Sequence, residues 1–213
     1  MLLHPRPDNH GKAVTIHHPH EPSALATWGN AKAASTVVPE GPLPASLNGI
    51  PMVPWGAADA GSEVWDRLAS GCSFEDPPFD PKGMKAASGA VVVESDGQVW
   101  LVAPTNAYGG YKATFPKGTS NGRDLRATAI KEVFEESGLQ VELSAFLVDV
   151  SKSVSRTRYY LAHRTGGSPA AMGWESQAVH LAPLSHLKEL LNSPNDMPIL
   201  DALKKTLAAS PCA

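Results

Sequence analysis

Short apolar runs bounded by turn-forming residues recur along the chain after residue 85. Such runs, rich in valine and aromatic side chains, predict β-strands. Between the first two runs, the segment Ser95-Asp96-Gly97 predicts a hairpin turn, because Gly97 is free to adopt a positive φ. The predicted strands are residues 86–94, 98–103, 141–150, 156–163 and 177–181.

Apolar residues at helical spacing separate some of these strands. Ile130, Val133 and Phe134 share one face at the helical period, and Gly138 can end that helix as a left-handed C-cap. Further helices are predicted at 59–71, 183–192 and about 195–208. The chain is therefore expected to contain both helices and strands.

The first 84 residues form a different kind of sequence, dense in proline and without a lasting helical period. We expect a loop-rich N-terminal extension over residues 1–84, with one short helix that Ser62 can cap, followed by a folded domain over 85–213. Apolar anchors favour an extension that wraps over the following domain or over a partner subunit, and they suggest a homodimer. These anchors are Trp28, Leu43, Leu47, Ile50, Met52, Val53 and Trp55.

Composition excludes several classes of protein. The 213 residues contain 42% hydrophobic residues and carry a net charge of −3, so no basic footprint for nucleic acid is expected. Two cysteines, Cys72 and Cys212, make neither a disulfide framework nor a zinc site. No membrane span or signal peptide is evident, and the expected compartment is the cytoplasm.

Carboxylates cluster on the helix that Gly138 ends. Glu132, Glu135 and Glu136 stand at positions i, i+3 and i+4, so they gather on one helical face. Most glutamate-rich faces are simply solvated, but like charges on adjacent turns repel unless a cation lies among them. Carboxylate oxygens are hard ligands that suit Mg²⁺ or Mn²⁺.

The order of parts around this cluster resembles the Nudix box, G-x5-E-x7-R-E-U-x-E-E-x-G-U with U a bulky aliphatic residue. The match spans residues 118–139 and is closest from Glu132 to Leu139, with Lys131 in place of the usual Arg. The loop after Gly118 is one residue short, and the early Glu is replaced by Asp124 or, in the preferred alignment, by Arg123. The brace that these two family residues usually form is therefore altered, since Lys cannot make the two-pronged contact of Arg.

The resemblance implies an α/β/α sandwich with a central mixed sheet, including a short third strand at 113–115. It also implies a metal site for Mg²⁺ or Mn²⁺. The residues that match the family's ligands are Gly118, through its backbone carbonyl, with Glu132, Glu135 and Glu136. Glycine suits position 118 because a side chain would crowd the metal.

Catalytic and substrate-binding candidates follow. Glu135 and Glu136 match the family's box, and Glu175 lies where many members carry a further glutamate before the last strand, so Glu136 or Glu175 is the expected base. The predicted contacts to phosphate or base are Lys117, Arg156, Arg158 and Tyr111, with Tyr108 an alternative for stacking. Each of these contacts has an ordinary structural explanation as well, such as a solvated lysine or a loop aromatic.

These features predict a metal-dependent pyrophosphohydrolase that acts on acid anhydrides. Its expected substrate is a small nucleotide or polyphosphate, namely a nucleoside diphosphate linked to another moiety, of the dinucleoside polyphosphate, ADP-ribose or NDP-sugar type. The alternative is a non-catalytic Nudix module that binds or senses a nucleotide, which the altered first half of the box and the long extension would favour.

Overall fold

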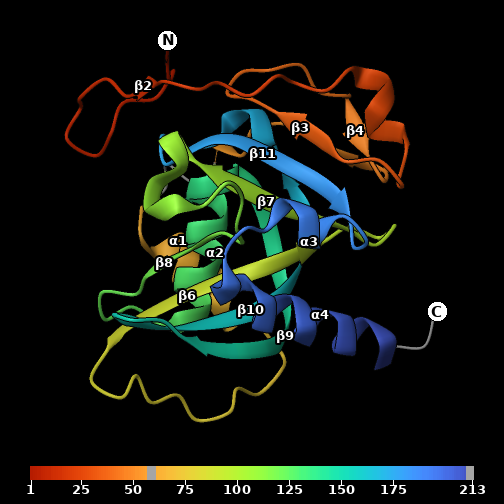
Figure 1. Ribbon diagram of the computed structural model, residues 1–213. Helices are drawn as coiled ribbons and strands as arrows, with labels where there is room; N and C mark the ends of the chain where they lie inside the picture. The colour runs from red at the N-terminus through yellow and green to blue at the C-terminus, as the bar shows by residue number, and fades with distance from the viewer. Residues whose placement is uncertain (57–60, 210–213) are drawn as a thin grey trace.

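The computed structural model describes residues 1–56 and 61–209, and its centre is a 7-stranded mixed sheet (Figure 1). Along the sheet the order is β3-β11-β7-β6-β10-β9, with β8 paired to β6 off this path. Strands β6 and β10 are parallel, and the other pairs are antiparallel. The strands are β3 (Ser35–Val37), β6 (Lys85–Val93), β7 (Gln98–Pro104), β8 (Lys117–Thr119), β9 (Leu139–Ser151), β10 (Ser155–Gly167) and β11 (Ser176–Pro183).

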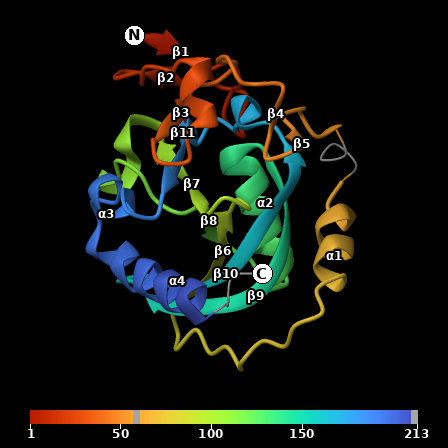
Figure 2. The same cartoon turned by 90° about the vertical axis from the view of Figure 1, so that its right-hand side faces the viewer.

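Helices cover both faces of this sheet, as Figure 2 shows. On one side lies α2 (Leu125–Ser137), with α1 (Glu63–Ser70) packed outside it; on the other lie α3 (Leu187–Leu190) and α4 (Met197–Ala209). Each side has its own apolar core. The predicted α/β/α sandwich with a central mixed sheet is confirmed. None of the helices described is long and apolar enough to span a bilayer.

The ends of α2 follow from local chemistry. The Asp124 side chain caps the helix by accepting hydrogen bonds from the backbone N–H groups of Arg126 and Ala127, at 2.9 and 3.0 Å. At the other end Gly138 adopts φ 70°, the left-handed C-cap predicted from the sequence. The capping role predicted for Ser62 on α1 is wrong, because its side chain makes no cap hydrogen bond.

The N-terminal extension wraps over the domain and adds β3 to the central sheet beside β11 (Figure 1). Trp28 is buried against Trp100, with ring centroids 6.0 Å apart, while Val53 is 60% exposed and anchors nothing. Trp55 packs edge-on against Phe134 of α2 at 5.3 Å. The other short elements here are β1 (Leu2–Leu3), β2 (Thr15–Ile16), η1 (Leu25–Gly29), β4 (Ser46–Leu47) and β5 (Ile50–Pro51).

Several predicted boundaries were wrong. The short strand expected at 113–115 is only an isolated bridge between Val102 and Thr114, and the paired strand is β8 instead. Pairing with β9 extends β10 to Gly167, beyond the end predicted at residue 163. The helix expected at 183–192 keeps only Leu187–Leu190. The first residues of the predicted helix 59–71, and Cys212, lie outside the described residues. Short 3₁₀ segments are η3 (Thr105–Gly110), η4 (Pro169–Ala171) and η5 (Pro194–Asp196).

A buried ion pair ties the extension to the sheet. Arg164 on β10 donates to Glu94 at 2.5 Å, and the side chains of this pair are 0% and 1% exposed. Arg164 also donates to the backbone carbonyl of Leu47 in the extension, at 2.8 Å. Glu94 accepts two further hydrogen bonds, from Trp100 and from Asn48. A buried pair with these partners is costly to break, because one uncompensated charge would remain.

Substitution Arg164→Met should lower the free energy of unfolding by about 3–5 kcal/mol, since it leaves the Glu94 carboxylate buried without its counter-ion. Urea denaturation at neutral pH measures this loss. The matched control is Arg123→Met, because the Arg123–Asp66 pair has side chains 26% and 57% exposed and should cost less than about 1 kcal/mol. Equal losses in the two variants would contradict this account of the buried pair.

Candidate functional site

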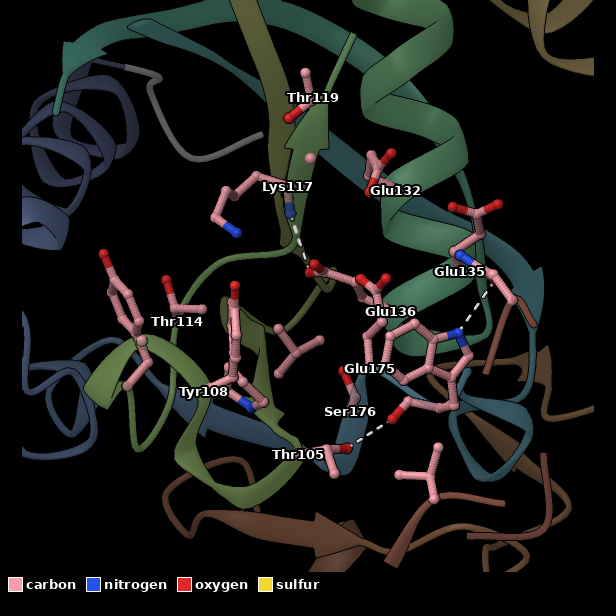
Figure 3. A pocket seen from close by; sticks show the side chains of 18 of the residues that line it. Thr105, Tyr108, Thr114, Lys117, Thr119, Glu132, Glu135, Glu136, Glu175 and Ser176 are labelled. Carbon is pink, nitrogen blue, oxygen red and sulfur yellow. Dashed lines mark hydrogen bonds between the residues drawn. The ribbon is translucent and has the colours of Figure 1, made fainter. Parts of the chain in front are cut away.

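A cavity of about 810 Å³ opens between α2, β8, the η3 segment and the start of β11. Figure 3 shows Glu132, Glu135 and Glu136 projecting from α2 toward it, with Glu175 beside Glu136. Lys117 enters from β8. The structure therefore brings the acidic residues predicted from the box together with Glu175, which is distant from them in sequence.

The glutamates differ in their exposure to water. Glu132 and Glu136 are buried, at 9% and 7% exposed, whereas half of the Glu135 side chain is exposed. Together with the buried apolar residues Ala127, Ile130 and Val133, these two glutamates leave α2 buried around most of its circumference. The acidic face is therefore a cavity wall and not a solvated surface. This arrangement separates the cluster from an ordinary glutamate-rich helix face.

Burial changes the acidity of this cluster. It raises the pKa of Glu136 to about 8, although the nearby charge of Lys117 opposes the change. Burial likewise raises the pKa values of Glu132 and Glu175, each with a further contribution from the charge of Glu135. The backbone N–H of Lys117 donates to a carboxylate oxygen of Glu136 at 3.1 Å. At neutral pH and without added positive charge, the Glu136 carboxyl therefore favours its protonated form.

Lys131 supplies a positive charge inside the acidic cluster. Its ammonium group lies 3.3 Å from Oε1 of Glu132 and also donates to Glu135. Burial works to lower the pKa of Lys131, but the two carboxylates outweigh burial and raise it. The lysine that replaces the family's arginine thus acts as a tethered counter-ion for two of the box glutamates.

The short loop between β8 and α2 uses its polar residues elsewhere. Arg123 donates to the carboxylate of Asp66 on α1 at 3.2 Å and to the backbone carbonyl of Ser62 at 3.1 Å. The Asp124 carboxylate is occupied in capping α2. Asp124 therefore does not pair with Lys131, and Arg123 carries the same charge as Lys131 and cannot pair with it. The extension holds the loop from outside through Asp66 and Ser62.

The donor set suits a hard divalent cation in its chemistry. All the side-chain donors are carboxylates, and a Cβ at Gly118 would overlap the carboxylate of Glu132, so only glycine allows this close approach. Within residues 1–56 and 61–209, however, no three His, Cys, Asp or Glu side chains are arranged to hold a metal ion. Two of the carboxylates are engaged by Lys131 instead.

The structure places only some of the predicted substrate contacts at the cavity. Lys117 and Tyr111 line the cavity, and the Tyr111 hydroxyl accepts a hydrogen bond from Lys152 at 3.4 Å. Arg156 and Arg158 do not line the cavity; both are paired with Asp149.

The pairing of Arg158 explains why it cannot reach the cavity. Its side chain is 2% exposed and donates two hydrogen bonds to Asp149, at 2.8 and 2.9 Å. The guanidinium group also lies 4.9 Å from the ring centroids of Phe79 and Phe146. The positive charge predicted at Arg158 is therefore paired inside the fold, with Asp149 of the neighbouring strand β9, and packs against Phe79 of the segment before the domain.

Other lining residues had no signal in the sequence. Asn9 and Val14 reach the cavity from the N-terminal extension, and Trp174 reaches it from the loop before β11. The Trp174 indole N–H donates to the side-chain oxygen of Asn9 at 3.2 Å. These contacts join segments far apart in the sequence, so no local spacing could reveal them.

Comparison with known proteins agrees with this geometry. The family model of the NUDIX domain matches residues 83–203, and the chain belongs to the Nudix family. The class predicted from the sequence, a Nudix-type pyrophosphohydrolase, is confirmed at the level of the family. Comparison with curated proteins finds no match.

Two solved structures share the fold. An Ap4A hydrolase from C. elegans in a binary complex is 19% identical, with 58% of this chain and 99% of that chain covered and a TM-score of 0.50. A NUDIX hydrolase from Nitrosomonas europaea is 20% identical, with 66% and 80% covered and a TM-score of 0.50. At these identities the likeness establishes the fold alone.

The raised pKa of Glu136 predicts a stability that falls with pH in metal-free protein. Unfolded Glu136 ionises near 4.5 but the folded group only near 8, so the unfolded chain binds fewer protons between these values. The free energy of unfolding should fall by up to about 1.4 kcal/mol per pH unit across that range. Glu136→Gln should flatten the slope and be more stable than wild type near pH 8.

Urea unfolding in EDTA across this pH range measures the slope. Glu63→Gln is the matched control, because Glu63 is exposed on α1 and should leave the slope unchanged. If wild type and Glu136→Gln lose stability equally per pH unit, burial does not raise the pKa of the Glu136 carboxyl as assigned here.

Proposed function

We propose that this protein is a divalent-metal-dependent hydrolase that cleaves the pyrophosphate bridge of a nucleoside diphosphate linked to another moiety. The observation that carries the proposal is the buried carboxylate cluster on α2, which lines a cavity together with Lys117 and Glu175. Like-charged carboxyl groups that are partly withdrawn from water are costly to hold together unless a cation lies among them. The family to which the chain belongs supports the same reaction class.

The residues that would hold Mg²⁺ or Mn²⁺ are Glu132, Glu135 and Glu136, together with the backbone carbonyl of Gly118. Glu135 is half exposed, so its side chain can turn from Lys131 toward the other carboxylates at small cost. Lys131 would then lose one partner and keep Glu132. We therefore expect metal binding and the release of Glu135 from Lys131 to be linked.

When bound, the ion supplies positive charge that offsets the phosphate charge and acidifies water. The base that removes the proton is Glu136 or Glu175, which lie beside each other in the cavity (Figure 3). Charge from a cation would lower the raised pKa of Glu136 and make its carboxylate available at neutral pH. Attack of the water oxygen on phosphorus would break the bridging P–O bond, and the bridging oxygen would leave with the departing phosphate group.

Lys117 is the proposed phosphate contact, because its side chain enters the cavity near Glu136. Tyr111 adds a hydroxyl that accepts a hydrogen bond from Lys152. Charge-assisted donors of this kind suit the oxygens of a diphosphate. Arg156 and Arg158 are not part of this proposal, since Asp149 holds both of them away from the cavity.

The cavity volume of about 810 Å³ is within the range of pockets that bury a nucleotide-sized ligand. Dinucleoside polyphosphates, ADP-ribose and NDP-sugars all contain the bridge that the site would cleave. We propose this group as the substrate class. The cytoplasmic location and the homodimer stay predictions.

A second candidate function is a module that binds a nucleotide without cleaving it. The contacts of Lys131 favour this alternative, because its ammonium group engages two of the carboxylates that the metal would need. In such a module Lys131 would remain in place when the nucleotide binds. Turnover distinguishes the two functions.

Metal-dependent release of phosphate or nucleotide should be detected from a panel of nucleotide substrates with Mg²⁺ and then with Mn²⁺. Glu135→Gln should reduce kcat by about 10²-fold or more, because it removes a charge needed for the metal. The matched control is Glu142→Gln on β9, whose side chain is 65% exposed and lies outside the cavity. Nucleotide binding without turnover would refute the hydrolase and favour the binding module.

A further inference from the structure

The N-terminal extension contributes directly to the cavity of the proposed hydrolase. Asn9 and Val14 are lining residues, although both precede the region that matches the family model, residues 83–203. Val14 is half-buried and contributes apolar surface to the cavity that Trp174 also lines. This part of the wall therefore belongs to the chain's own extension and not to the shared domain.

Hydrogen bonds hold residues 9–18 at the cavity rim. The Asn106 side chain donates to the backbone carbonyl of Thr15 at 2.8 Å and accepts from the backbone N–H of His17 at 2.9 Å. Gln177 on β11 donates to the carbonyl of His18 at 3.0 Å. With the bond between Trp174 and Asn9, the extension is attached to both loops that border the cavity.

One of those loops is strained, and the extension supports it. Asn106 and Ala107 have φ values of 54° and 53°, in the left-handed region, which asparagine tolerates but alanine rarely adopts. Asn106 is held there from both sides, because Gln177 accepts its backbone N–H at 2.8 Å. The strained turn presents Tyr108 at the rim with 83% of its surface exposed.

The cavity consequently has two chemically different parts. Carboxylates and lysines occupy the wall formed by α2 and β8, whereas Tyr108, Trp174, Val14 and Pro104 line the side nearest η3 and the extension. Figure 3 shows Tyr108 across the cavity from Glu132 and Glu135. Aromatic faces with nearby apolar surface bind planar rings by stacking, and they have no particular affinity for phosphate.

We propose that residues 9–17 of the extension, through Asn106, build the subsite for the nucleoside ring of the substrate. Asn106 positions Tyr108, while Asn9 fixes the Trp174 ring and Val14 closes the space beside it. This inference rests on the proposed function, because a substrate whose phosphates bind at the α2 and β8 wall would have its ring on the aromatic side of the cavity. It assigns ring recognition to a segment outside the family domain.

The test compares a ligand that has a ring with one that lacks it. ADP and inorganic pyrophosphate are each titrated calorimetrically, with Mg²⁺, into the full chain. Asn106→Ala removes both bonds to the extension, and Val14→Trp fills the space beside Trp174. We expect each variant to bind ADP about tenfold more weakly or worse, as for loss of one base stack, with pyrophosphate affinity unchanged.

Asn30→Ala is the matched control, because Asn30 is an exposed asparagine of the extension whose side-chain oxygen accepts a hydrogen bond from the backbone N–H of Lys32, away from the cavity lining. Thermal melting confirms that each variant is folded, and Val14→Trp keeps the test decisive if Asn106→Ala is unstable. Unchanged ADP affinity in a folded variant, or equal loss of both ligands, overturns the inference. A wild-type protein that binds neither ligand with Mg²⁺ refutes the proposed function itself.

Discussion

Burial of like-charged carboxylates on α2 is the constraint on which the site depends. Glu132 and Glu136 are nearly removed from water, so their charges need partners that the helix cannot supply alone. Lys131 offers one from the same helix, and Lys117 offers another from β8. The close approach of Gly118 and the position of Glu175 complete a cavity in which the carboxyl groups outnumber the two lysines that balance them.

The N-terminal extension is part of the folded domain rather than an attachment to it. On the outer side of α2, Arg126 of this helix donates to Asp76 at 2.9 Å. Trp65 and Trp55 pack there against Phe134 of the same helix. At the opposite end, the extension forms a sheet strand and reaches the cavity rim. These contacts restrict the motion of α2 and β11, which carry residues that line the cavity.

Charged residues that look alike in the sequence have different roles in the structure. Arg158 is stabilised between Asp149 and two phenylalanine rings, and Arg164 is the counter-ion of buried Glu94. Both are structural, because each is buried and paired with a carboxylate and neither lines the cavity. Lys117, on a short strand at the cavity edge, keeps its side chain available.

The sequence by itself determined the features that depend on local spacing. The helix with its glutamates, the left-handed Gly138 and the hairpin at Gly97 follow from periodicity and backbone freedom, and the family resemblance then implied the α/β/α fold. Only the tertiary structure decided which charges meet. Arg158 pairs with Asp149, Arg123 pairs with Asp66, and Asn9 and Val14 line the cavity. The physical reason is that these contacts join segments far apart in the chain, where burial and competition among partners, and not local spacing, select the pair.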